Sequence, residues 1–235
     1  MKTGNPVTYG LVLVFSALSF LSAFAGEVAV EDLTKWSFYG TGSGKVERGM
    51  FYMKEERDSK GVMIISPEAY GENLTVRYQV MPMSAASVCV VILSASDSGD
   101  GKALTLPSGY DGAMGHWIQH VRNYFFAFHN AAHNATPFAI RFPEKRTIGQ
   151  CEENLLKAGE FYSIEAGRHE ERLWLKVNGQ LIFEGHDENP LGAGHIAFRI
   201  RGLSEEPASC LIRKVTIESS GNDEGAEGDA VHRAP

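Results

Sequence analysis

The feature of this sequence that most restricts its fold is a succession of short β-type segments with no long amphipathic helix between them. Runs rich in Val, Ile, Phe and Tyr alternate with turn residues, and no helical period of apolar residues lasts beyond about ten residues. A parallel α/β sheet would require helices between its strands. The pattern therefore predicts an all-β sandwich or barrel. Strands are expected at 46–53, 62–66, 74–81, 87–93, 124–128, 138–142, 161–166, 172–177, 180–184, 195–201 and 210–218.

The segment 172–184 predicts a β-hairpin around Asn178-Gly179. These two residues supply the positive φ angles of a type I′ turn, whose twist matches that of the flanking strands. Alternation along the first strand separates an apolar set from a mixed set. The apolar set, expected in the core, is Leu173, Leu175 and Val177, and the mixed set, expected on a wetter face, is Arg172, Trp174 and Lys176.

The first 25 residues have the pattern of a secretory signal peptide. Lys2 is their only charge, an apolar stretch covers 11–21, and Ala23-Phe24-Ala25 forms a small-x-small cleavage site. The stretch is shorter than the ~20 residues of a membrane-spanning helix, although an uncleaved anchor is the alternative reading. We expect a secreted or periplasmic protein with no membrane insertion after signal cleavage.

The remainder of the chain reads as one domain followed by a tail. We expect a β-sandwich domain over 26–218, with one short helical turn at 152–157. Residues 219–235 are rich in Gly and acidic side chains and poor in apolar ones, which predicts a disordered tail.

The charge balance and the cysteines restrict partners and chemistry. The net charge of −7 argues against nucleic acid or anionic lipid as partner, because both favour clustered Lys and Arg. Three cysteines are too few for a disulfide framework. Cys89 lies in an apolar run and reads as a buried hydrophobe, whereas Cys151 and Cys210 are left open as a pair.

The second half of the chain resembles the closing strands of a concanavalin A-like, laminin G-like jelly roll. The residues that carry this likeness are Phe161-Tyr-Ser-Ile-Glu, the Asn-Gly hairpin, Gly194-His-Ile-Ala-Phe-Arg-Ile and Leu211-Ile-Arg-Lys-Val-Thr-Ile-Glu218. The resemblance implies a jelly-roll β-sandwich of two antiparallel sheets. Many functions share this architecture, so it predicts the fold and not an activity.

A narrower resemblance comes from Asn123-Tyr-Phe-Phe-Ala-Phe-His-Asn130 and Asn134-Ala-Thr-Pro-Phe-Ala-Ile-Arg141. These segments resemble the bacterial YesU-like family. That family has the same fold and tends to accompany polysaccharide-degradation systems, which implies a polysaccharide or oligosaccharide as partner. It provides no established catalytic residue to carry over.

Four of the eight histidines fall between residues 116 and 133, within a block that is dense in polar and aromatic groups. If 115–124 is extended, His116, His120, Arg122 and Tyr124 share one face, and Trp117, Gln119 and Asn123 share the other. Such a row suits a sugar, whose hydroxyls bond to polar groups and whose C–H face packs on aromatic rings. The predicted binding residues are His116, Trp117, Asn123, His129, Asn130, Asn134 and Arg141.

Cleavage of the glycan, by a hydrolase or a lyase, is a separate hypothesis. No Glu-x-Asp-x-Glu strand provides the paired carboxyl groups of a glucanase. A lyase instead needs a neutral base and a group that steadies an anion. We assign these roles to His120, Arg122 and Tyr124.

Other readings of the same residues stay open. The aromatic residues of 124–128 fit a core, and Arg122 and Arg141 fit ion pairs with acidic neighbours. The chain could also be a non-catalytic laminin G-like interaction module. No metal ligands and no cofactor are assigned, although Asp97, Asp100 and Asp111 lie in Gly-rich loops that would suit a calcium-stabilised lectin.

Overall fold

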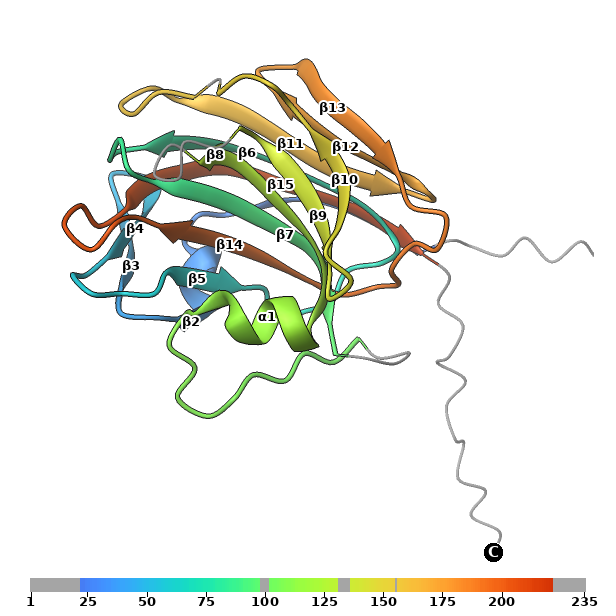
Figure 1. The fold of residues 1–235 in the computed structure, drawn as a ribbon, viewed down its shortest axis with the longest axis horizontal. Helices are drawn as coiled ribbons and strands as arrows, with labels where there is room; N and C mark the ends of the chain where they lie inside the picture. The colour runs from blue at the N-terminus through green and yellow to red at the C-terminus, as the bar shows by residue number, and fades with distance from the viewer. Residues whose placement is uncertain (1–21, 98–101, 131–135, 155, 222–235) are drawn as a thin grey trace, which may run out of the picture.

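The protein is a β-sandwich, seen in a computed structural model that describes residues 22–97, 102–130, 136–154 and 156–221 (Figure 1). One α-helix, α1 (Met114–His120), and one 3-10 helix, η1 (Asp32–Lys35), accompany the strands. The strands are β1 (Ser22–Val28), β2 (Ser37–Tyr39), β3 (Gly42–Glu47), β4 (Met50–Glu55), β5 (Val62–Ile65), β6 (Asn73–Pro82), β7 (Val88–Ser96), β8 (Arg122–Asn130), β9 (Phe138–Phe142), β10 (Arg146–Gln150), β11 (Tyr162–His169), β12 (Arg172–Val177), β13 (Gln180–His186), β14 (His195–Arg201) and β15 (Ser209–Gly221).

The strands form two antiparallel sheets. The eight-stranded sheet has the order β13-β12-β11-β6-β15-β4-β3, with β1 also paired to β15. The seven-stranded sheet has the order β10-β9-β8-β7-β14-β5-β2. Neighbours in the sheets are mostly distant in sequence, as in the pairing of β6 with β15, which is the connectivity of a jelly roll and not of a simple meander. The predicted sandwich of two antiparallel sheets is confirmed.

The main core lies between the two sheets and is made by alternating strand residues. In β6 the buried residues alternate with half-buried ones along the whole strand, as period-two patterning requires. The predicted hairpin shows the same alternation, and its residues Leu173, Leu175 and Val177 are buried in this core. Asn178 and Gly179 have φ angles of 50° and 81°, which confirms the type I′ turn.

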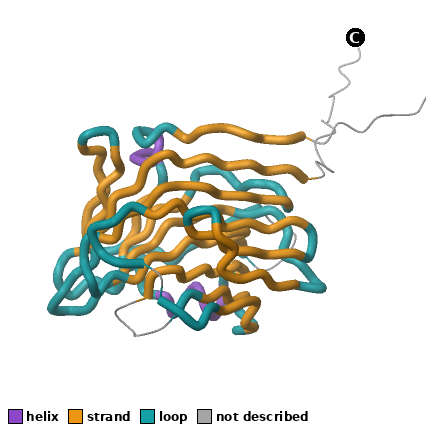
Figure 2. Tube along the Cα trace, turned by 90° about the horizontal axis from the view of Figure 1, so that it is seen from above, coloured by secondary structure: helices purple, strands orange, loops and turns teal. Residues whose placement is uncertain are grey.

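A second apolar cluster covers the outer face of the seven-stranded sheet. Strand residues such as Ile65, Ile92 and Phe125 point away from the main core and are buried together with Trp117 of α1. This explains why β7 is buried along its entire length, with both faces covered. In Figure 2 the two helical segments lie on opposite sides of the layered strands. On this outer face, α1 packs together with the loop before it, from which Leu104, Leu106 and Tyr110 contact the cluster.

The structure corrects three local predictions. Residues 46–53 form two strands instead of one, because Arg48 and Gly49 take φ angles of 50° and 71° and turn the chain between β3 and β4. The described residues of 152–157 form no helix. Residues 115–120 are helical, not extended, and the strand begins at Arg122.

The first and last described strands pair with each other. β1 pairs with β15 from Ser22↔Gly221 to Val28↔Val215, so the sheet includes residues 22–25, and it continues three residues past the predicted boundary at 218. Residues 1–21 of the predicted signal peptide (1–25) and residues 222–235 of the predicted tail (219–235) lie outside the described residues. Within the described ranges, none of the helices has the length and apolar character needed to cross a bilayer.

The cysteines are all free, so the Cys151–Cys210 pairing that was left open is not formed. Cys89 and Cys210 are both buried in the main core, and burial raises the pKa of each thiol. The interpretation of Cys89 as a small buried hydrophobe agrees with this placement.

Candidate functional site

The predicted row of sugar-binding side chains is divided by the helix α1. Because 3.6 residues make one turn, His116 and His120 lie one turn apart, with ring centroids separated by 5.1 Å. Trp117 points the opposite way and is fully buried against the seven-stranded sheet. The prediction that 115–124 presents one continuous polar face is therefore wrong, and Trp117 is a core residue.

The start of β8 sends its predicted site residues into the protein. Asn123 is fully buried, and its Nδ2 donates a hydrogen bond to the carbonyl oxygen of Val121 at 2.8 Å. Tyr124 is fully buried on the opposite face of the strand, toward the main core. Arg122 is partly exposed. These placements do not bring His120, Arg122 and Tyr124 together on one open surface.

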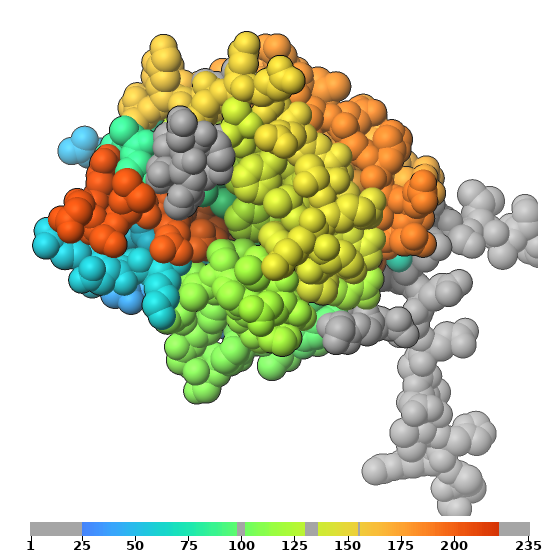
Figure 3. Space-filling view, viewed as in Figure 1, coloured from blue at the N-terminus to red at the C-terminus, as the bar shows by residue number. Residues whose placement is uncertain are grey.

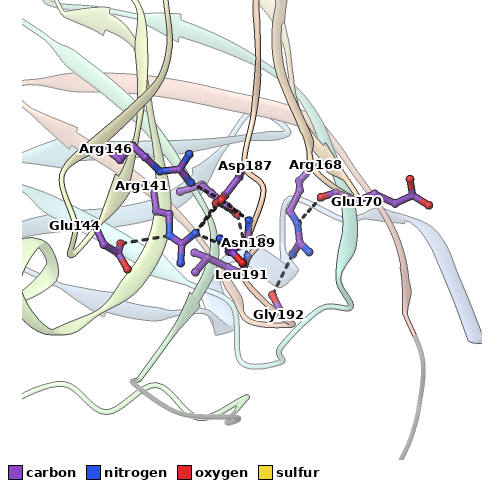
Figure 4. Close-up of polar contacts among 10 residues, drawn as sticks. Arg141, Glu144, Arg146, Arg168, Glu170, Asp187, Asn189, Leu191 and Gly192 are labelled. Carbon is purple, nitrogen blue, oxygen red and sulfur yellow. Dashed lines mark hydrogen bonds and ion pairs between the residues drawn. The ribbon is translucent and has the colours of Figure 1, made fainter.

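Tyr124 instead belongs to a buried polar cluster around Asp187. Figure 4 labels Asp187 together with Arg141 and Arg146. The Tyr124 hydroxyl donates to the Asp187 carboxylate at 2.7 Å and accepts from the backbone N–H of Leu191 at 2.9 Å. Arg141, directly opposite Tyr124 on β9, donates to both carboxylate oxygens at 2.9 and 2.7 Å. Arg146 of β10 forms a further ion pair with Asp187.

The electrostatics of the cluster favour an ionised Asp187 and a neutral Tyr124. Burial opposes ionisation of Asp187, but the hydrogen bonds from Tyr124 and the backbone of Asn189, and the Arg141 guanidinium, outweigh it and lower its pKa. Burial, followed by the bond to Asp187, raises the pKa of Tyr124. A Tyr held this way keeps its proton, so the cluster is suited to fixing the loop after β13 onto β8, β9 and β10.

Arg168 lies beside this cluster and is also buried. It donates to the backbone carbonyls of Glu170 at 3.4 Å and Gly192 at 3.3 Å, and burial lowers its pKa. These contacts tie the end of β11 to the same loop (Figure 4). The interpretation of Arg141 as the partner of an acidic residue agrees with the structure, although that residue is 46 positions away.

The remaining predicted residues lie elsewhere or outside the described residues. His129 is buried opposite Cys89 at the far end of β8, and burial lowers its pKa. Nothing is described of the Asn130 side chain or of Asn134. A single open trough that collects the polar groups of 115–141 is therefore not present among the described residues.

A different site lies on the outer face of the seven-stranded sheet, beside α1. Here a cavity of about 240 Å³ opens, and the space-filling view shows a hollow bordered by the α1 segment, β9 and the end of β14 (Figure 3). Most of its described lining is apolar. The described lining residues are Val88, Met114, Phe125, Ala127, Phe138, Arg199 and Arg201.

Strand β14 provides the two charges of this pocket by alternation. Arg199 pairs with Val90 and Met63, and both neighbours belong to the outer apolar cluster, so the Arg199 side chain starts on that face. Arg201 follows two residues later on the same face. Phe198 and Ile200 point into the main core.

Arg199 is held by backbone carbonyls and not by an acid. Its Nη2 donates to the carbonyl oxygens of Lys60 at 2.8 Å and Gly112 at 3.3 Å, and its Nε has no partner among the described residues. The side chain is 3% exposed, and burial lowers its pKa to about 10, so it is still charged at neutral pH.

A glycine at position 61 makes room for this guanidinium. Gly61 has a φ of +115°, and a Cβ built there would lie 2.2 Å from Nη2 of Arg199. Only a residue without a side chain allows both this backbone conformation and this approach. The sequence carried a signal for the site, since two Arg residues at i and i+2 in a predicted strand must share a face.

No metal centre is found in the part of the chain that the structure describes, where no three His, Cys, Asp or Glu side chains converge. Of the three acids considered for calcium, Asp97 accepts hydrogen bonds from the backbone of Thr105 and Asp111 pairs with Lys60 at 2.8 Å. Asp100 lies outside the described residues.

Comparisons with known proteins identify the fold. No family model and no curated protein matches this sequence. A Bacillus subtilis protein of unknown function with a galectin-like fold superposes with a TM-score of 0.72 at 16% identity, covering 85% of this chain and 100% of that chain. The chain has a concanavalin A-like fold. The resemblance inferred from sequence is confirmed at this level, and the YesU-like likeness agrees with the Bacillus structure.

Two further structures share this concanavalin A-like fold. The carbohydrate recognition domain of Emp47p matches with a TM-score of 0.56 at 10% identity, over 80% of this chain and 89% of that chain. A Bacillus licheniformis β-glucanase matches with a TM-score of 0.52 at 11% identity, over 87% and 94% of the two chains. At these identities the likeness defines the architecture and not the activity.

Proposed function

We propose that this protein binds a polysaccharide or oligosaccharide outside the cytoplasm, in the pocket beside α1. The observation that carries the proposal is the pairing of an apolar, aromatic wall with two guanidiniums in one cavity on a sheet face. Phe125 and Phe138 offer ring surface for the C–H face of a sugar. The guanidiniums of Arg199 and Arg201 donate to oxygen atoms at the other side of such a ligand.

The fold supports this proposal without deciding it. One structure that shares it is a carbohydrate recognition domain and another is a β-glucanase, so the same sandwich carries saccharide sites in other proteins. Export of the chain rests on the signal-peptide pattern of its first 25 residues.

The pocket favours binding over cleavage. Hydrolysis by the common glycosidase mechanism needs two carboxyl groups that flank the scissile bond, and the described lining includes no Asp or Glu. A lyase base must reach the proton that it removes. Tyr124 is turned into the main core, where its hydroxyl is bonded to Asp187. We therefore propose a binding module and not an enzyme.

Affinity electrophoresis in gels that contain single polysaccharides tests the proposal. We expect at least one polysaccharide to retard the mature protein, and Phe138→Ala to remove most of that retardation. Phe161→Ala is the matched control, because Phe161 is also partly exposed but lies under Arg213 on the eight-stranded sheet.

The outcomes separate the binding claim from the assignment of its site. If no polysaccharide retards the wild-type protein, carbohydrate binding is refuted. If Phe138→Ala binds as the wild type does, or if Phe161→Ala loses binding equally, the pocket is the wrong site. Circular dichroism confirms that each variant is folded before it is compared.

A further inference from the structure

The pocket beside α1 contains two positive charges that form no ion pair with any described acidic side chain. Neither Arg199 nor Arg201 forms an ion pair with a carboxylate among the described residues. The buried carboxylate of Glu55 attracts the Arg199 cation and opposes the fall in its pKa, but it makes no ion pair with it, and its Oε2 accepts hydrogen bonds from the backbone N–H groups of Gly202 and Ala208. Asp111 is occupied by Lys60. The two guanidiniums thus share one apolar cavity in which no described carboxylate contacts either of them.

This arrangement is costly for the protein on its own. A buried cation loses its hydration, and a buried donor without an acceptor loses its hydrogen bond to water with no replacement. The Nε of Arg199 is such a donor, enclosed and without a partner in the described structure. Its Nη1 also has no hydrogen bond among the described residues and is not enclosed, so it remains able to donate into the pocket.

The guanidinium of Arg199 is fixed in place by the surrounding backbone. Gly40, Gly61 and Gly112 all have positive φ angles and pack directly on one another, since a Cβ on Gly112 would lie 1.9 Å from the Gly61 carbonyl oxygen. The carbonyls of Lys60 and Gly112 then hold Nη2 of Arg199. A charge held in position before binding loses little entropy when a ligand arrives.

We propose that the pocket selects acidic saccharides, with a uronate carboxylate or a sulfate ester placed between Arg199 and Arg201. This inference rests on the proposed function and names its ligand class. A planar guanidinium donates in parallel to two oxygens of a carboxylate or a sulfate, and such charge-assisted bonds are stronger than those to neutral hydroxyls. Met114 and Phe138 pack against the ring that carries the anion.

Paired polymers that differ only in charge test the inference. Polygalacturonate is compared with its carboxyl-reduced form, and a sulfated galactan with its desulfated form, by calorimetry or gel retardation at low and high salt. We expect the wild type to bind at least one acidic polymer tenfold or more tighter than its neutral counterpart. The preference should shrink as salt screens the charges.

Arg201→Gln is the main variant, because Arg201 is partly exposed and makes a single weak contact to Lys60 at 3.5 Å. We expect it to lose tenfold or more in affinity for the acidic polymer and little for the neutral one. Arg213→Gln is the matched control, since Arg213 is also partly exposed, bonds to Gln79 and pairs with no carboxylate. Arg199→Lys keeps the charge but removes the fork, and we expect it to weaken acidic binding while the protein stays folded.

Each outcome decides a separate point. Equal affinity for the acidic and neutral polymers overturns the acidic preference and leaves the proposed function standing. Absence of binding to all four polymers and to every polysaccharide in the gels overturns the proposed function itself. An equal loss in Arg213→Gln and Arg201→Gln shows that overall charge acts, which overturns the assignment to this pocket. Preference for the carboxylate or the sulfate pair identifies the anion.

Discussion

Two regions of this molecule bury arginine, and they balance its charge in opposite ways. At the end of the sandwich, Arg141 and Arg146 converge on Asp187, whose side chain is fully enclosed. Beside α1, Arg199 is more deeply buried than either of them, and its hydrogen-bond partners among the described residues are backbone carbonyls. The first region is neutralised from within the chain, whereas the second is left for another molecule to neutralise.

This difference shows how the partners of a buried charge indicate its role. A buried ion pair with additional hydrogen bonds is complete, and its loss damages the fold. Arg168 is also held by backbone carbonyls, but it lies beside the Asp187 cluster, whose charge stabilises it. A buried cation that lines an open cavity and contacts no carboxylate, as Arg199 does, is easier to explain by a ligand than by stability. The residues predicted from sequence, Tyr124 and Arg141, belong to the complete region.

The largest effect is expected for Asp187→Asn. The change removes the carboxylate that Arg141 and Arg146 share. Among the described residues, Arg141 then keeps one acidic partner, the exposed Glu144. Two buried or half-buried cations then lose their partner, so the free energy of unfolding should fall by about 3–5 kcal/mol. Urea denaturation measures it. Asp111→Asn, which breaks an exposed pair with Lys60, should stay close to the wild type; a similar loss there would contradict the distinction.

A smaller effect tests the comparison more directly. Arg141→Met and Arg199→Met should lower the free energy of unfolding by different amounts. The first leaves Asp187 buried with fewer donors, so it should cost about 3 kcal/mol. The second removes two hydrogen bonds to carbonyls but also an unpaired buried charge, so we expect about 1 kcal/mol or less. Thermal and urea unfolding of the two variants should rank them in this order. The reverse order would show that Arg199 is structural.

The fold followed from the sequence because its signals are local and repeated. Alternation placed the hairpin residues Leu173 and Leu175 in the core, and Asn178-Gly179 specified the turn. The prediction failed at 115–120, where α1 has no side-chain cap at its N-terminus and follows Gly112 and Ala113. That helix forms because Trp117 is buried against a sheet face built from distant strands, which no window of sequence contains.

The candidate site was harder to predict for the same reason. The density of His and Asn in 115–141 drew the interpretation to one segment, while the pocket gathers residues from β7, α1, β8, β9 and β14. The partner of Tyr124 and Arg141 is Asp187, which is 63 and 46 residues away from them. A sequence shows that Arg199 and Arg201 share a face, but only the folded chain shows that they lack an acid.

Acid titration sharpens the contrast on the outer face of the eight-stranded sheet. Burial alone would raise the pKa of Glu165, but hydrogen bonds from Lys176, Arg77 and Trp174 outweigh it and lower the pKa to about 2. A carboxyl with a lowered pKa stabilises the fold above its ordinary value of 4.5, and this contribution is lost as the pH falls through about 2. As the pH falls from 4.5 to about 2, the free energy of unfolding should therefore decline less in Glu165→Gln than in the wild type. An equal decline in the two proteins would refute the lowered pKa of Glu165.

The smallest effect is expected where an arginine is paired but exposed. Arg172 and Glu184 form an ion pair diagonally across the neighbouring strands β12 and β13, and their side chains are 51% and 32% exposed. Water screens such a pair, and holding both side chains in one geometry costs conformational entropy. The net contribution of the pair to stability is therefore small. Glu184→Gln should leave the melting temperature within the error of the wild type at physiological salt. A loss comparable to that of Asp187→Asn would mean that pairing matters regardless of burial. The contrast between the two arginine regions would then have to be explained by geometry alone.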